Sequence, residues 1–416
     1  MAAPVVAVVE TLTFRPAWSD PDTARIEWRD TESVPIDEIE ESLWPHTPFG
    51  DDLLMNADEW RLRGDPSWTT RTLHGDYNRV DRLQLSVGGE LHPSDHALPR
   101  IGARFGYSFG RKRTLYGVRF EQPLLPNEWL AVGASMDRRT AHPDLQQIPD
   151  WENSLDLLFG RNDHRNYFER SGIGAYATTR LGDLTTASLH VRNDEYASLA
   201  LEGGVTSILW RERELRANPE IDPGEVHTWA LQLERLARRK VAPRAGIYHW
   251  LSLERAGHGL GGEFEYTRLL GDLRTVLRLS PATTLAVRLA AGHTLEGTLP
   301  AQRRFTLGGV DALRAHNAAT FEGDRIALAQ AEYTFGLWRF ERLDGVNSDL
   351  SVIVFADAGS AWSGPGHDWN LGDQRVAIDG GFGIGTGDET LRVYFARDLR
   401  EPAGPFNVTA RLQRPF

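Results

Sequence analysis

The chain has 416 residues, no cysteine and a formal net charge of −12. This length is enough for two or three soluble domains or for one large barrel, and the lack of cysteine excludes disulfides and thiolate chemistry. The acidic balance argues against nucleic acid as a main partner. No run reaches the roughly 18–20 apolar residues that a membrane helix needs. A mean hydropathy of −0.40 is still compatible with a barrel, because only alternate strand residues would meet lipid.

Residues 1–76 form an acidic, irregular stretch that is rich in tryptophan. Residues 5–14 are a candidate strand, and residues 36–43 a candidate short helix. The opening apolar run, residues 5–9, lacks the charged start of a signal peptide. We therefore expect an N-terminal extension that acts as a plug, a periplasmic segment or a first strand. We also expect that this chain lacks its signal peptide.

From residue 78 onward, segments of about ten residues alternate between apolar and polar side chains, and turn residues separate them. In residues 283–293, for example, Leu285, Val287 and Leu289 alternate with residues that include Arg288. The candidate strands are 79–90, 100–110, 114–121, 129–139, 170–181, 184–196, 225–238, 243–255, 263–279, 282–293, 324–336, 349–360, 375–386, 390–398 and 407–416.

A soluble β-sandwich alternates in the same way, but the connections between these strands come in two sizes. Transmembrane barrels have short turns on one side and long loops on the other, and usually an even number of strands. We therefore predict an all-β fold: a membrane-spanning, antiparallel, up-and-down β-barrel of about sixteen strands over residues 77–416. The strand missing from the list should lie in the first 76 residues or in residues 140–169.

The long loop 294–323 contains the sequence RRFTLGGVDALRAH, residues 303–316. It resembles the inward-folded loop of the BamA/TamA superfamily, the bacterial surface antigen barrels. The residues that match the pattern of that loop are Phe305, Leu307, Gly308, Gly309, Leu313 and Arg314. Ala315 and His316 stand where the family has a glycine and an aromatic residue. Alanine adopts a positive φ less readily than glycine does.

The segments that follow this loop also resemble the family, in order and in spacing. Glu332 lies in QAEYTF, Asp357 lies in FADAG, and residues 380–387 with 391–399 resemble the penultimate pair of strands. The resemblance implies a loop folded inward before the fifth strand from the C-terminus, locked by a cluster of Arg314 with Glu332 and Asp357. Independently of the family, a guanidinium inside a barrel needs partners, and two carboxylates can bind it bidentately.

The last segment, residues 407–416, ends in phenylalanine, as the assembly signals of outer-membrane barrels do. The residues expected to form this signal on one face are Val408, Ala410, Leu412 and Phe416. Arg414 shares that face and could snorkel to the membrane edge. The resemblance is closest over 301–416, weaker over 77–300, and absent over 1–76. Those first residues lack the pattern of a POTRA repeat, so the chain resembles a POTRA-less branch or an isolated barrel.

Other motifs favour ordinary structural explanations. The glycine-rich residues 380–387 lack the lysine and hydroxyl residue of a phosphate-binding loop, so we predict a barrel strand near a turn. The acidic residues 150–156 lack EF-hand spacing and predict a solvated loop. No histidine motif for zinc and no serine nucleophile elbow is present. We expect no metal, no cofactor and no enzyme, with an outer-membrane hydrolase as a minor alternative.

The resemblance implies a barrel of the bacterial outer membrane that helps proteins, or lipids, to insert into or cross that membrane. Its partners would be outer-membrane lipid and lipopolysaccharide, client proteins, and a periplasmic or surface protein. The mechanism would lie in a seam between the first and last strands, where an open edge can template an incoming strand. One alternative is a closed structural or passive pore barrel, plugged or bound to a partner. Another is a soluble β-rich protein.

Overall fold

The computed structural model describes residues 60–61 and 69–411, except for 92–97, 126–128, 147, 182–184, 202, 210–211, 236–245, 258, 260, 281–282, 342–346, 365 and 387–390. The predictions for residues 5–14, residues 36–43, Leu412, Arg414 and Phe416 lie outside this part of the chain. Within it, no helix is long and apolar enough to cross a membrane. Most of the predicted N-terminal extension is likewise outside the described residues, and its role stays a prediction.

One antiparallel sheet of 17 strands dominates the fold, and the two-residue β1 (Trp60–Arg61) pairs with its first long strand. The first half of the long strands is β2 (Thr69–Asn78), β3 (Arg82–Leu91), β4 (Arg100–Ser108), β5 (Arg113–Pro123), β6 (Leu130–Ala141), β7 (Phe168–Arg180), β8 (Thr185–Ser198) and β9 (Gly224–Arg235). The second half is β10 (Gly246–Ala256), β11 (Tyr266–Ser280), β12 (Thr283–Gly297), β15 (Arg325–Glu341), β16 (Asn347–Trp362), β17 (Ala377–Thr386), β18 (Arg392–Asp398) and β19 (Asn407–Arg411).

These long strands pair with their neighbours in chain order, which confirms the prediction of an antiparallel up-and-down fold of about sixteen strands. The strand missing from the sequence-based list is β2, at the end of the first 76 residues. The two strands left out of the series, β13 (Phe305–Leu307) and β14 (Phe321–Gly323), form a separate small hairpin in the loop between β12 and β15.

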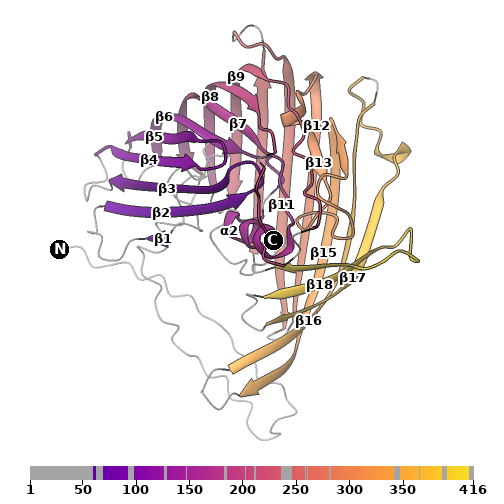
Figure 1. The fold of residues 1–416 in the computed structure, drawn as a ribbon. Coiled ribbons are helices and arrows are strands. Elements are labelled where there is room, and N and C mark those ends of the chain that lie inside the picture. The colour runs from indigo at the N-terminus through magenta and orange to yellow at the C-terminus, as the bar shows by residue number, and fades with distance from the viewer. Residues whose placement is uncertain are drawn as a thin grey trace, which may run out of the picture.

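The sheet is curved, and its early and late strands face each other (Figure 1). In the view of Figure 1, β2 and β3 lie on one side, β17 and β18 lie on the other, and α2 (Asp150–Gly160) lies between them. The inner side of the sheet therefore surrounds α2 and the loop between β12 and β15. We call this space the lumen.

The strands carry their polar side chains inward and their apolar side chains outward. In β8, Leu189 and Val191 are exposed, whereas the alternate residues His190, Arg192 and Asp194 are buried. A soluble sheet has the opposite polarity, because it buries its apolar face. The observed order is that of a barrel whose outer face meets lipid.

This polarity predicts the effect of a charge on the outer face. Leu289, in the middle of β12, is 49% exposed, and Leu289→Arg should lower the free energy of unfolding by about 2 kcal/mol in lipid. Urea unfolding in phospholipid vesicles, followed by tryptophan fluorescence, measures this change. Leu295→Arg, at the end of the same strand, is the matched control, because the cost falls to about 0–1 kcal/mol near the interface. Equal costs at the two positions would contradict a lipid-facing surface.

The structure corrects one prediction for the connection between β6 and β7. Residues 150–156 are not a solvated loop but the first turns of α2, in which Glu152 and Asn153 are buried. The helix begins directly after Pro149, and acidic side chains in its first turn favour the positive end of the helix dipole. It ends where Arg161 adopts the left-handed conformation, with φ 55°.

Candidate functional site

The loop between β12 and β15, residues 298–324, folds into the lumen as predicted; we call it the lumen loop. Its two arms, β13 and β14, pair antiparallel, and residues 308–320 between them form its tip. The predicted motif residues Phe305, Leu307 and Leu313 are buried in an apolar cluster with residues of β12 and β15, such as Ala290 and Ile326. Apolar packing therefore fixes the arms of the loop against the inner wall.

The glycine pair of the motif is required by the backbone at the start of the tip. Gly308 and Gly309 have φ values of +116° and +87°, which side chains with a Cβ rarely adopt. A Cβ at Gly308 would lie 2.2 Å from the backbone oxygen of Asn317. The Gly309 N–H donates to the His316 oxygen at 3.0 Å, which closes the tip on itself.

The structure brings together the three residues of the predicted cluster. The Arg314 guanidinium donates to Asp357 through Nε and Nη2, both at 2.8 Å, and to Glu332 through Nη1 at 2.8 Å. Arg314 is 1% exposed, and the two carboxylates come from neighbouring strands, β15 and β16. Burial opposes the charge of Arg314, but Asp357 and Glu332 outweigh it, so the pKa of the guanidinium is raised. The tip is thus held by a charged group that has its partners in place.

Two aromatic rings complete the surroundings of Arg314. Its guanidinium carbon lies 3.8 Å from the ring centre of Phe355 and 4.8 Å from that of Tyr394. The Tyr394 hydroxyl donates to Glu332 Oε2 at 3.1 Å, and Arg392 also forms an ion pair with Glu332. Rings over a guanidinium add cation–π attraction to the ion pairs. Glu332 therefore links the tip to β18 as well as to its own strand.

Two further polar residues were missed by the sequence analysis. Gln330 Nε2 donates to the Ala312 oxygen at 2.7 Å and to Asp357 Oδ1 at 3.1 Å. Arg288 Nη1 donates to the Asp311 oxygen at 2.7 Å. Arg288 and Gln330 lie opposite each other on β12 and β15. Both residues are polar and stand at inward positions of strands whose residues alternate in polarity. This pattern was the signal that could have identified them.

The departures from the family pattern at the tip have their own contacts. Ala315 does not adopt a positive φ, and its N–H donates to Asp379 Oδ2 at 2.7 Å. His316 Nδ1 lies 3.1 Å from Asp379 Oδ1, and Nε2 lies 3.6 Å from Asp398 Oδ2. The imidazole also packs on Phe321, with 5.1 Å between ring centres. These residues hold the tip against β17 and β18.

The last strand contacts the tip from two inward positions. Asn407 Nδ2 donates to the Arg314 oxygen at 2.7 Å. Arg411 Nη1 donates to the Val310 oxygen at 3.2 Å and to Asp311 Oδ1 at 3.0 Å. Burial alone would raise the pKa of the Asp311 carboxyl, but Arg411 and a second arginine hold it below its usual value. The tip thus touches every strand from β15 to β19.

The residues of the predicted assembly signal are described in part. Val408 and Ala410 are exposed on the outer face of β19, and Leu412 and Phe416 lie outside the described residues. Their role as a signal stays a prediction. The glycine-rich residues 380–386 lie in β17, where a Cβ at Gly381 would meet the backbone oxygen of Phe395 at 1.9 Å.

The arrangement of charged and aromatic side chains around Arg314 is suited to mechanical support of the tip. In the described part of the chain, no group of three or more His, Cys, Asp or Glu side chains could hold a metal ion. The charged side chains Asp311 and Arg314 of the tip form ion pairs with residues of the surrounding strands. The site can hold five strands in a fixed relation and would have to loosen before β19 could move.

Comparison with known proteins decides the family. The Omp85 superfamily domain matches residues 100–388, which is more than half of the chain. This chain belongs to the Omp85 superfamily. The resemblance to BamA/TamA-type barrels is therefore confirmed.

Individual Omp85 relatives are distant. The outer membrane protein assembly factor BamA of Nitratidesulfovibrio vulgaris is 26% identical in an alignment of 232 residues that covers 50% of this chain and 27% of BamA. The match thus spans about a quarter of that relative. The crystal structure of BamA from Haemophilus ducreyi lacking POTRA domains 1–3 aligns with a TM-score of 0.54 and 11% identity, covering 93% of this chain and 78% of that chain. CdiB from Acinetobacter baumannii aligns with a TM-score of 0.42 and 11% identity, covering 80% of this chain and 56% of that chain.

Proposed function

We propose that this chain is an integral outer-membrane barrel that helps proteins to insert into, or to cross, the outer membrane. Its membership in the Omp85 superfamily and its similarity to a protein named as an outer-membrane assembly factor support this function. The observation that carries the proposal is the contact of the lumen tip with the last strand, through Asn407 and Arg411. The position of β19 thereby depends on a loop inside the barrel.

The proposed mechanism uses the seam, by which we mean the junction between β2 and β19. Strand edges present unpaired N–H and C=O groups, and an extended segment of a client can add to such an edge by backbone hydrogen bonds. In the described part of the chain, β19 pairs with β18 alone, and the β2 edge opposite β3 is paired only with the two-residue β1; when β1 and β19 move away from β2, each edge becomes a template. The lumen tip braces β15 to β19, so these strands move as one unit. The process needs no covalent chemistry, and we infer that the chain is not an enzyme.

The partners follow from the surfaces. The exposed leucine, valine and phenylalanine side chains of the outer face would contact outer-membrane lipid and lipopolysaccharide. Client proteins would meet the seam, and a periplasmic or surface partner would meet the rims. Residues 1–76, apart from those in β1 and β2, would form a plug or a periplasmic segment.

Assisted folding of a client tests this function. The full chain in phosphatidylethanolamine–phosphatidylglycerol vesicles should speed the folding of an urea-unfolded eight-stranded barrel at least several-fold over protein-free vesicles. The heat-resistant band of the client on semi-native gels is the measure. Unrelated barrel protein at the same density is the control for lipid disturbance.

The role of the seam is tested in the same assay with a reversible block. Leu73→Cys and Ala410→Cys place thiols on the exposed faces of β2 and β19 in a chain that has no cysteine of its own. A cleavable bismaleimide should abolish the acceleration, and cleavage should restore it. Acceleration that survives the cross-link would refute the seam mechanism. No acceleration at all, with ion conductance in the same bilayers, would instead favour the passive pore.

A further inference from the structure

Helix α2 contacts the first long strand from inside the lumen. Ser154 Oγ lies 2.7 Å from Asp76 Oδ1, and the Tyr77 N–H donates to Ser154 Oγ at 2.9 Å. One turn earlier, Asp150 Oδ2 lies 3.5 Å from His74 Nε2. His74 and Asp76 are buried, so these contacts lie on the lumen side of β2. One face of α2 is therefore attached to the β2 side of the seam.

The same helix contacts the last strand. Arg411 Nε donates to Glu152 Oε1 at 2.7 Å, with Arg411 3% exposed and Glu152 1% exposed. The remaining part of this guanidinium binds Asp311 and Val310 of the tip. Arg411 therefore joins three elements: β19, α2 and the lumen loop. Because α2 binds both β2 and β19, it spans the seam by side chains alone.

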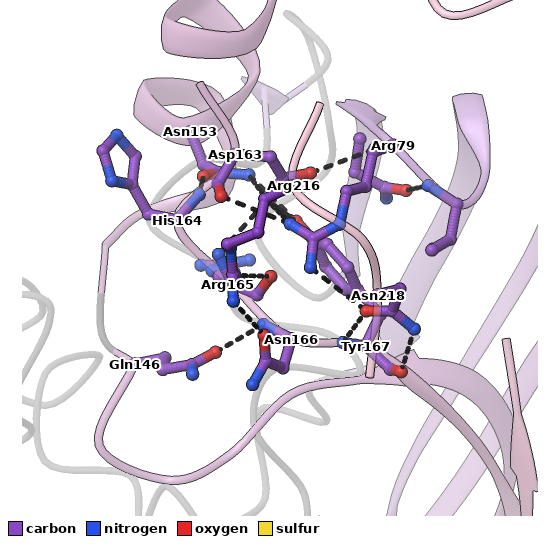
Figure 2. Close-up of polar contacts among 12 residues, drawn as sticks. Arg79, Gln146, Asn153, Asp163, His164, Arg165, Asn166, Tyr167, Arg216 and Asn218 are labelled. Atoms are coloured by element: carbon purple, nitrogen blue, oxygen red, sulfur yellow. Dashed lines mark hydrogen bonds and ion pairs between the residues drawn. The ribbon is translucent and has the colours of Figure 1, made fainter. Parts of the chain in front are cut away.

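The segment that follows α2 is anchored firmly on the β2 side (Figure 2). Arg79, in the turn between β2 and β3, donates from its backbone N–H to Asp163 Oδ2 at 3.0 Å and from Nη2 to Asn218 Oδ1 at 3.2 Å. Asn153 of α2 donates to Asp163 Oδ1 at 3.2 Å and to the Tyr167 hydroxyl at 2.9 Å. Figure 2 shows these residues converging from three segments of the chain. Helix α2 therefore belongs mechanically to the β2 side.

From these contacts we propose that α2 is an internal clasp that holds β19 close to the β2 side and releases it at the Glu152–Arg411 ion pair; in the described part of the chain, no ladder joins β2 to β19. The β2 side is fixed by several hydrogen bonds and by the network around Arg79. The β19 side depends on a charge pair, and water or another carboxylate can replace Glu152 as the partner of Arg411. Separation of β19 from β2 must break this pair or pull α2 from its anchors. The inference rests on the proposed function for its biological meaning but not for its test.

Distance measurement across the seam tests the clasp without any client. Nitroxide labels on Leu73→Cys and Ala410→Cys, read by electron–electron double resonance in vesicles, should give one narrow distance distribution in the otherwise unchanged chain. Glu152→Ala should produce a second population, longer by at least one strand spacing, about 4.8 Å. Ser154→Ala removes one of several contacts on the β2 side, so the distribution should stay narrow, because the network around Arg79 still anchors α2.

Asp194→Ala is the matched control for loss of a buried carboxylate. Arg192 binds Asp194 at 2.7 Å and keeps Asp137 at 2.6 Å, just as Arg411 keeps Asp311 when Glu152 is removed. The control should leave the seam distance unchanged. The clasp is overturned if Glu152→Ala keeps the narrow distribution, or if Asp194→Ala or Ser154→Ala broadens it equally.

The outcomes for the clasp and for the proposed function are separable. Opening of the seam in Glu152→Ala supports the clasp even if the unchanged chain accelerates no client folding, a result that would contradict only the proposed function. Conversely, suppose that the unchanged chain accelerates client folding while Glu152→Ala leaves the seam distance unchanged. That result would support the proposed function and reject the clasp.

Discussion

Replacement of Arg314 with alanine should lower the free energy of unfolding by about 3–5 kcal/mol, because it removes the cation from a buried ionic cluster. Asp357 would keep only the amide of Gln330 as a polar partner among the contacts described above. Glu332 would keep Arg392 and Tyr394. Urea unfolding in vesicles and the temperature at which the heat-resistant band disappears both measure this loss.

The matched control for Arg314 lies on the same loop. Arg304 pairs with Glu322 at 3.1 Å, but both side chains are 44% exposed. Arg304→Ala should therefore cost no more than about 0.5 kcal/mol. A double-mutant cycle of Arg314→Ala with Asp357→Asn should be strongly non-additive, since the second change removes the carboxylate that the first leaves unpaired. Equal losses for the two arginine variants would exclude a locking role for the cluster.

Gly308→Ala should strongly destabilise the tip of the lumen loop. The φ of +116° costs an alanine about 1–3 kcal/mol. The contact of 2.2 Å with the Asn317 oxygen adds an overpacking cost of about 1–3 kcal/mol, because the obstacle is backbone. The same unfolding measurements apply, with increased trypsin cleavage after Arg314 as a local readout of an undocked tip.

Gly203→Ala is the control for this substitution. A Cβ at Gly203 would meet nothing within 4 Å, so its effect should stay within about 0.5 kcal/mol. A tip that remains protease-resistant and fully stable with alanine at position 308 would show that the loop does not require the positive φ.

The sequence predicted the outer wall of the barrel well, because lipid and lumen impose a period of two on each strand. The polarity of a residue alone predicts its side of the sheet: Leu289 faces outward and Arg288 faces inward. The strand β2 escaped this rule because its sequence, TTRTLHGDYN, contains a single aliphatic side chain, Leu73, and therefore no apolar alternation. Only the requirement for an even strand number indicated that a strand was missing.

The Arg314 cluster was predictable because its residues stand in motifs of fixed order. The contacts of α2 were not, because Glu152 and Arg411 are separated by 259 positions and belong to no motif. An acidic side chain in an irregular stretch is usually solvated. Glu152 is buried because it pairs with Arg411 of the last strand. The residues that neighbour Glu152 in the sequence do not indicate this partner.

The contacts of Arg314 also set an order on assembly. Its carboxylate partners follow it by 18 and 43 residues, and Asn407, which binds its backbone oxygen, follows by 93. Contacts of such sequence separation form late, since the loop-closure entropy must be overcome first. Before β16 is in place, Arg314 lacks its partner Asp357, so we expect its guanidinium to stay hydrated until then. Water would therefore leave the lumen around the tip only after the C-terminal strands have assembled.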